Sequence, residues 1–263
     1  MLENMVNFYL APNLPADRHA FFGRNGGVSE GIYASFNFNR KSRDKAENIE
    51  KNLELVGRFY GLPGNAVMRP CQGHTDKAVY VDRPSRYEIE ADGVVTDRPG
   101  IILGITTADC MPVLLADEKH GVIGAAHAGW RGALAGFIEN TVKVMLERGA
   151  AVEDIAAAAG PCLQKESFEV QNDMRNLFLD RDKDNERFFT PCAGERWLCD
   201  LDGSEQHCPA ASRASNQPGS QNYKQAKRSR PYFLFLCRVS YSLSSYLKIA
   251  SALLYETSAL RPA

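Results

Sequence analysis

The stretch ADGVVTDRPGIILGITTADCMPVLLADEKHGVIGAAHAGWRG, residues 91–132, decides the fold. Two runs rich in Ile, Val, Gly and Ala, at 100–106 and 121–126, are too short for helices and are bounded by turn residues, which is typical of strands. A third short run at 111–115 predicts a hairpin with the second. After the HAGWRG turn the apolar residues recur at helical spacing, so the predicted order is strand, turn, helix.

Side chains able to bind a metal stand where these runs end. Cys110 lies in a TADC turn after the first run, and His127 ends the last. His74 lies in a Gln-Gly-His turn, where a lone histidine is more often structural or on the surface. One Cys and two His together form a recognised zinc set that leaves a fourth position for water or substrate. The ligands are 36 and 17 residues apart, so the spacing alone does not establish a site.

Composition limits the class of protein. With 263 residues, 44% hydrophobic and 10% aromatic, the chain can bury a sizeable core as one domain or two tightly joined halves. A net charge of −1 argues against nucleic acid as an obligatory partner. The sequence has no run of eighteen apolar residues, and its N-terminus has no basic stretch followed by an apolar one, as a signal peptide would. We therefore expect no membrane partner and a cytoplasmic protein. Seven cysteines without framework spacing fit reduced thiols.

Five sequence blocks carry a family resemblance: QGH at 72–74, ADGVVT at 91–96, TADCMPVLLAD at 107–117, AAHAGWRG at 125–132 and GPCLQKESFEV at 160–170. Together they resemble the bacterial polyphenol oxidase family, also called the laccase-domain or peptidoglycan editing factor family. The resemblance implies an α/β fold with mixed sheets sandwiched between helices, similar to the catalytic domain of cytotoxic necrotising factors. It also implies a catalytic zinc held by His74, Cys110 and His127.

The resemblance implies three kinds of activity. The first is phosphorolysis of adenosine, inosine, guanosine and methylthioadenosine, with deamination of adenosine; the second is copper-dependent phenol oxidation, and the third is editing of muropeptide precursors. Zinc has no redox chemistry, and five histidines are too few for the several coppers of a laccase. We therefore favour a Zn²⁺-dependent purine nucleoside phosphorylase and deaminase, with a purine nucleoside and phosphate as small-molecule partners. Alternatives are Cu²⁺ in the same ligands, since copper binds such donors more tightly, and an inactive zinc-binding domain. Monomer and homodimer both remain open.

Two arginines are expected near the substrate. Arg40, with Asn37, stands beside a glycine-dense loop at 23–33 that either turns the chain or lets the backbone approach a ligand. Arg131 opens a predicted helix, where it holds phosphate or pairs with a carboxylate such as Asp109. Both arginines are candidates to bind phosphate.

Three other residues have two interpretations each. Asp92 precedes a glycine and either turns a loop or orients a ligand or a substrate hydroxyl, so it joins the candidate substrate contacts. Cys162 is expected to be a buried structural thiol, because catalysis needs the fourth metal position open. Trp130 could stack on a base, but an aromatic residue between small ones more often packs in the core.

The pattern changes after about Leu201. Residues 203–263 hold no Asp, two Glu and eight Lys or Arg, and they lack the family's closing motif of aromatic residues and arginines. We divide the chain into a catalytic domain at 1–202 and a divergent segment at 203–263, in which 208–230 has the composition of disordered chain. A shifted reading frame from near Gly203 would explain the abrupt change; a divergent subfamily is the alternative.

Overall fold

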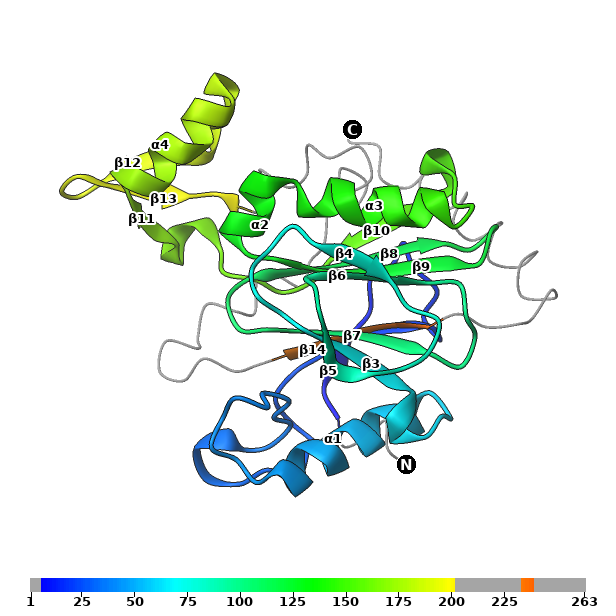
Figure 1. Ribbon diagram of the computed structural model, residues 1–263. Coiled ribbons are helices and arrows are strands. Elements are labelled where there is room, and N and C mark those ends of the chain that lie inside the picture. Colours follow the sequence, from blue (N-terminus) through cyan, green and yellow to red (C-terminus); the bar gives the residue numbers. More distant parts are fainter. Residues whose placement is uncertain (1–5, 202–232, 239–263) are drawn as a thin grey trace.

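The computed structural model describes residues 6–201 and 233–238. Two mixed β-sheets lie face to face, and helices cover their outer faces (Figure 1). Helix α1 (Ala46–Phe59) lies on the six-stranded sheet, and α3 (Phe137–Glu147) lies on the five-stranded sheet. The predicted α/β architecture, with mixed sheets between helices, is confirmed.

The six-stranded sheet combines strands from residues 6–201 with the strand from residues 233–238. Its order is β1 (Phe8–Tyr9), β2 (His19–Phe22), β14 (Phe233–Arg238), β7 (Ile102–Thr107), β3 (Val67–Cys71) and β5 (Arg86–Glu90). Strand β14 pairs antiparallel with β2 and β7, whereas β3 runs parallel to β7 and β5. A piece of the segment predicted to be divergent is therefore an interior strand of this sheet. The stretch predicted to be disordered, 208–230, lies outside the described residues.

The five-stranded sheet carries the stretch that opened the sequence analysis. Its order is β10 (Ala156–Ala159), β8 (Met111–Asp117), β9 (Val122–Ala128), β6 (Gly93–Thr96) and β4 (Ala78–Tyr80). Strands β8 and β9 form the predicted hairpin, from the pair Met111–Ala128 to the pair Asp117–Val122. Every residue of both strands is buried, because one face meets the other sheet and the other face meets α3. Burial on both faces explains why these strands read as continuous apolar runs.

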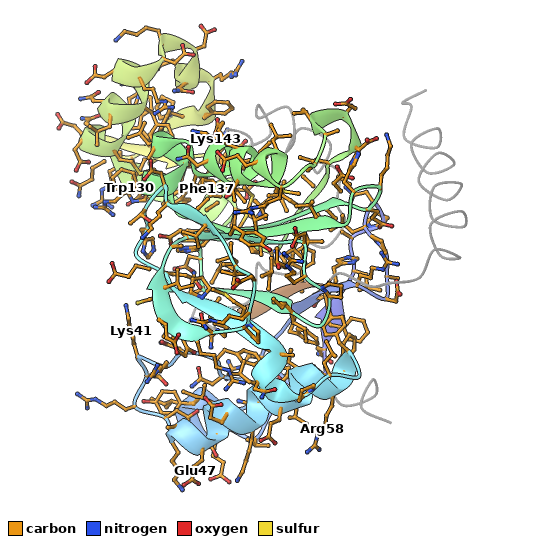
Figure 2. All side chains as sticks on the ribbon, turned by 45° about the vertical axis from the view of Figure 1, so that its right-hand side comes forward. Lys41, Glu47, Arg58, Trp130, Phe137 and Lys143 are labelled. Atoms are coloured by element: carbon orange, nitrogen blue, oxygen red, sulfur yellow. The ribbon has the colours of Figure 1, made fainter. Side chains whose placement is uncertain are left out.

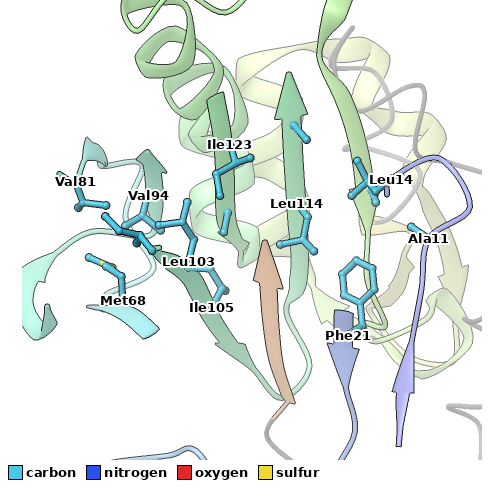
Figure 3. Packing of buried hydrophobic residues seen from close by; sticks show 14 residues of the cluster. Ala11, Leu14, Phe21, Met68, Val81, Val94, Leu103, Ile105, Leu114 and Ile123 are labelled. Carbon is cyan, nitrogen blue, oxygen red and sulfur yellow. The ribbon is translucent and has the colours of Figure 1, made fainter. Parts of the chain in front are cut away.

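The space between the sheets is filled by hydrophobic side chains, most of them aliphatic (Figure 3). Met68, Leu103 and Ile105 of the six-stranded sheet meet Leu114 and Ile123 of the five-stranded sheet, and all five are at most 5% exposed. Burial of such side chains contributes about 1.5–3 kcal/mol each. This core fixes the distance between the sheets and so the depth of any cavity at their edge.

The two long helices bury one face each. In α1, Ile49, Leu53 and Val56 recur at helical spacing and pack on the six-stranded sheet, while Glu47 and Arg58 project outward (Figure 2). In α3 the buried side chains are Phe137, Ile138, Thr141 and Met145. None of the helices in the described residues has the length and apolar character needed to cross a membrane.

A smaller lobe packs beside the main body. It contains the sheet β11 (Glu169–Gln171), β13 (Arg196–Cys199) and β12 (Phe189–Cys192), with helices α2 (Trp130–Ala135) and α4 (Asn172–Arg181). Trp130 packs against the core of this lobe, as expected for an aromatic residue between small ones, and Cys162 is buried under α3. The short 3-10 helices are η1 (Gly31–Tyr33), η2 (Gly64–Ala66), η3 (Val152–Asp154), η4 (Lys165–Ser167) and η5 (Lys183–Phe188).

Candidate metal centre

Three separate turns and strand ends bring the predicted ligands together. His74 lies in the turn after β3, Cys110 in the turn between β7 and β8, and His127 near the end of β9. Their ligand atoms all lie within 4.8 Å of one another. The Cys110 Sγ is 3.8 Å from the His74 Nε2, and the two imidazole centroids are 4.7 Å apart.

Asp92 is the hub that holds two of these ligands. Its carboxylate is 0% exposed and accepts from the backbone N–H groups of Gly73, His74 and Thr75 and from the Thr75 hydroxyl. It also accepts from the Nδ1 of His127 at 2.8 Å. Because that bond occupies Nδ1, it fixes the ring and leaves Nε2 as the metal-binding nitrogen, the usual arrangement of a carboxylate behind a histidine ligand.

The turn that carries His74 is held in an unfavourable conformation. His74 has a φ of 60°, in the left-handed region that non-glycine residues rarely adopt. Besides the bonds to Asp92, Gln72 exchanges two hydrogen bonds with the backbone of Thr106, both at 2.9 Å. The turn is thus tied to β6 on one side and to β7 on the other, which sets the direction of the imidazole.

Gly129 allows the last strand to approach the site. A Cβ at this position would lie 2.7 Å from the His74 Cδ2 and 3.3 Å from the Cys110 Sγ. The first distance is too short for any side chain, so only glycine lets the backbone after His127 pass this close to the other ligands. This requirement accounts for the first glycine of the HAGWRG block.

The cluster is electrostatically coupled. Burial would raise the pKa of the Cys110 thiol, but hydrogen bonds and charge from His127 and His74 outweigh burial and lower it to about 7. Burial would lower the pKa of His127, but Asp92 and Cys110 raise it to about 9. Burial opposes ionisation of Asp92, yet its donors hold its pKa well below the usual value. The site therefore makes the Cys110 thiol easier to ionise and keeps Asp92 as a carboxylate.

These residues fit a metal ion. A thiolate and two imidazoles are donors that zinc and copper both accept, and three protein ligands leave one position open. Asp92 supplies the supporting hydrogen bond that histidine ligands require. The donor chemistry and the close grouping agree, so His74, Cys110 and His127 would hold the ion.

The candidate ligands line a cavity of about 630 Å³. Arg40, Lys41, Arg69 and Tyr87 also line it, so the cavity combines metal donors with a group of cations. Its volume suits a small-molecule ligand, since pockets for such ligands are about 300–1,000 Å³.

The structure places the other predicted site residues differently from one another. Arg40 lines the cavity. Asn37 lies outside the lining: it is 7% exposed, and its amide donates to Asp44 and to a serine of its own loop. Arg131 is exposed and stacks on the Trp130 ring at 4.2 Å from the centroid, so the fold does not bring it to the cavity. Asp92 lies behind the metal ligands, where protein donors rather than solvent surround it.

Sequence reasoning missed Arg69, Tyr87 and Lys41, which all line the cavity. Arg69 and Tyr87 come from β3 and β5, which pair with each other in the six-stranded sheet. The signal for Arg69 was an arginine in a strand whose other side chains are mostly apolar, because a charged residue is seldom fully buried without a partner. Tyr87 carried no comparable signal.

Comparison with protein families decides the relationship. Residues 18–211 match the family described as multi-copper polyphenol oxidoreductase laccase. The chain belongs to this laccase family. The recognition made from the QGH, TADC and HAGWRG blocks is thereby confirmed.

Within this laccase family the chain is similar to proteins named purine nucleoside phosphorylase. The one from Deinococcus radiodurans is 42% identical over 168 residues, which cover 64% of this chain and 65% of that protein. The one from Bacteroides thetaiotaomicron is 37% identical over 170 residues, covering 61% and 63%. The chain thus spans a little less than two thirds of the length of these relatives. A crystal structure of a Neisseria meningitidis protein matches with a TM-score of 0.73 and 25% identity, over 89% of this chain and 99% of that one.

Proposed function

We propose that this chain is a zinc-dependent purine nucleoside enzyme. It would cleave adenosine, inosine, guanosine and methylthioadenosine with phosphate, and deaminate adenosine. The observation that carries the proposal is the convergence of His74, Cys110 and His127 on a cavity of about 630 Å³ that also presents cations. The names of the relatives from Deinococcus and Bacteroides support the phosphorylase class.

The residues around the ligands have defined tasks in this proposal. A zinc ion held by the three ligands would supply a Lewis acid and lower the pKa of water for attack at adenine C6. Asp92 accepts a hydrogen bond from the Nδ1–H of His127 and keeps that ring in one tautomer. Gln72 and Asp92 together keep the His74 turn in place when substrate enters. Preorganisation of this kind removes the cost of arranging donors during the reaction.

Phosphorolysis places a different demand on the chain. An oxygen of phosphate forms a bond to the ribose C1′ while the C1′–N9 bond breaks, and the bonding electron pair leaves with the purine, which then takes up a proton. The chain must therefore hold a dianion beside the sugar. Arg40 lines the cavity and supplies positive charge for this purpose, whereas Arg131 does not line it.

Oxidation of phenols with a single copper in the same ligands is the second candidate. The N/S donor set favours it, because copper binds such sites more tightly than zinc. A laccase with several coppers needs further histidine clusters. Among the described residues, the other grouping of potential ligands contains one histidine and two aspartates. The donor set therefore supports one transition metal here rather than several.

Product analysis with adenosine tests the proposed function. Zinc-loaded protein should form inosine without phosphate, and adenine should appear only when phosphate is added. Cys110→Ala should lose both products, while Arg58→Gln on the outer face of α1 should keep both (Figure 2). A folded, zinc-loaded protein that forms none of inosine, adenine and hypoxanthine would refute the proposal. Oxygen uptake with a phenol by copper-loaded protein alone would favour the second candidate.

A further inference from the structure

Arg69 is a buried cation whose bonds all go to neutral acceptors. It lies in β3, is 3% exposed, and lines the cavity. Its Nη1 donates to the Phe38 carbonyl at 2.7 Å and to the Tyr87 hydroxyl, and its Nη2 donates to the Thr106 hydroxyl. Within the described part of the chain, no carboxylate forms a hydrogen bond or ion pair with it.

The guanidinium also keeps unused donors. Both hydrogens of Nη1 and one of Nη2 are engaged, and the buried Nε has no partner among the described residues. Nε and Nη2 share one edge of the guanidinium, the fork that binds two oxygens of a carboxylate or phosphate. The groups that tie Arg69 down thus leave the Nε donor of this edge buried and unpaired by any residue that the structure describes, in a residue that lines the cavity.

Burial makes this arrangement costly without a counter-charge. Burial lowers the pKa of Arg69, because an apolar setting disfavours its charged form. A guanidinium nevertheless stays protonated in proteins, so the charge persists. Buried charges are normally paired with an opposite charge. Since Arg69 lines the cavity, an anion bound there would provide the missing partner.

Neighbouring cations strengthen the case for an anion. The guanidinium carbons of Arg40 and Arg69 lie 4.8 and 4.9 Å from the centroid of the same Tyr87 ring. Lys41 also lines the cavity, whereas Asp109 is the single carboxylate in its lining. Three cations against one carboxylate raise the local concentration of anions. The grouping of the two arginines around one aromatic ring marks out one region of the cavity.

We propose that Arg69, Arg40 and Lys41 form a phosphate-binding subsite in the same cavity as the metal ligands. The choice of inorganic phosphate as the anion rests on the proposed function. The buried charge of Arg69 and the nearby cations would favour any phosphate-containing anion. In phosphorolysis the subsite would hold inorganic phosphate before reaction and the phosphate of ribose 1-phosphate afterwards. Arg69 would supply the buried positive charge in the wall of the cavity, and Arg40 and Lys41 would close the exposed side.

Titration calorimetry of the zinc-loaded protein in phosphate-free buffer tests the subsite. Inorganic phosphate and ribose 1-phosphate are titrated separately, so that the two sources of the anion are distinguished. One phosphate should bind per chain, and Arg40→Gln and Arg69→Gln should each weaken binding by about 10- to 100-fold, the cost of losing a hydrogen bond to a charged group. Arg58→Gln is the matched control, because this arginine is 65% exposed on α1. Equal affinity in all four proteins would overturn the proposal.

The outcome can be separated from folding and from the proposed function. Zinc content and thermal unfolding show whether each variant is intact. Should Arg69→Gln fail to fold, Arg40→Gln decides alone, since the Arg40 side chain stacks on Tyr87 and forms no hydrogen bond with the described residues. Phosphate binding that depends on the arginines, in a protein that cleaves no nucleoside, would keep the subsite and refute the function. Phosphorolysis with an unchanged KM for phosphate in both arginine variants would refute the subsite and keep the function.

Discussion

A histidine near each end of the β8–β9 hairpin pairs with a buried aspartate. Near its open end, His127 donates from Nδ1 to Asp92; at its turn, His120 donates from Nδ1 to Asp117. Both bonds are 2.8 Å long, and both carboxylates belong to residues that are 0% exposed. The two pairs are nearly the same in local geometry.

Their surroundings differ. His120 is 34% exposed, and the third group of its cluster, Asp154, pairs with Lys119 at 2.9 Å. The Asp117 carboxylate accepts hydrogen bonds from His120 and from the backbone N–H of Ala151, so it connects the hairpin to the chain after α3. The first pair instead meets a thiolate, a second imidazole and a cavity. An Asp–His pair is therefore not a metal centre in itself; the additional soft donors and the open side make one.

The largest expected effect is loss of metal from Cys110→Ala. Loss of a residue that supports a metal ligand lowers metal affinity by about 10- to 100-fold. Removal of the charged ligand itself should lower zinc affinity by more than this. Cys71→Ala is the matched control, because Cys71 lines the same cavity without belonging to the ligand group. Metal analysis and competition with a chromophoric chelator measure the difference. If Cys110→Ala still bound one zinc ion tightly, the thiol would not be a ligand, and the contrast between the two Asp–His pairs would fail.

Paired substitutions of the two aspartates test the comparison directly. In Asp92→Asn and Asp117→Asn, the new amide N–H₂ group faces N–H groups that now donate to the carboxylate. Both variants should therefore be less stable, by about 1–3 kcal/mol for an unsatisfied buried group. Asp92→Asn alone should also lower zinc affinity, by about 10- to 100-fold. Urea unfolding and the chelator competition separate the two effects. An equal fall in zinc affinity in both variants would show that the hairpin acts as one unit.

A third histidine, His19, sharpens the comparison because it is buried against backbone groups. Burial lowers its pKa, while its Nδ1 donates to the Pro15 carbonyl and its Nε2 accepts from the Ala11 N–H. The unfolded chain then binds the proton more readily. Stability should fall as pH drops below the unfolded-state pKa of about 6.5, by at most about 1.4 kcal/mol per pH unit, and His19 should have no effect above it.

His19→Gln should flatten this slope. Urea unfolding of both proteins between pH 7 and pH 5 measures it, and the comparison uses the slope rather than the absolute stability. Parallel slopes for the two proteins would show that His19 is already protonated in the folded state or accessible to solvent.

The smallest expected effect is that of His120→Gln. The residue is partly exposed, and Asp117 keeps the backbone N–H donors of residues 120 and 151, so thermal stability should change slightly and the zinc content should stay at the wild-type value. Metal analysis of this variant beside His127→Gln, which should lose zinc, compares equivalent changes in the two pairs. Zinc loss from His120→Gln would reveal a second ion at the turn.

Local patterns made some of this structure predictable. Short apolar runs that end in Cys110 and His127 predict buried strands that deliver two ligands to neighbouring turns, and β7, β8 and β9 lie there. The helices at 46–59 and 137–147 follow from apolar residues at helical spacing.

Long-range pairing made the rest unpredictable. Arg69 and Tyr87 meet because β3 pairs with β5, and Arg69 reaches Thr106 because β3 also pairs with β7. No local pattern encodes those contacts. Arg131 follows the last ligand closely in sequence, yet α2 carries it outside the cavity lining, a position that proximity in sequence did not reveal. Likewise, composition at 203–263 did not reveal that β14 inserts between β2 and β7.

Cleavage of inosine in phosphate buffer, followed by phosphorus NMR, tests the central claim most directly. In both the zinc-loaded protein and its Asp117→Asn variant, the amount of hypoxanthine released should equal the amount of ribose 1-phosphate. Cys110→Ala should release neither product. Hypoxanthine without ribose 1-phosphate, or unchanged turnover by Cys110→Ala, would contradict the assignment of phosphorolysis to the site formed by His74, Cys110 and His127.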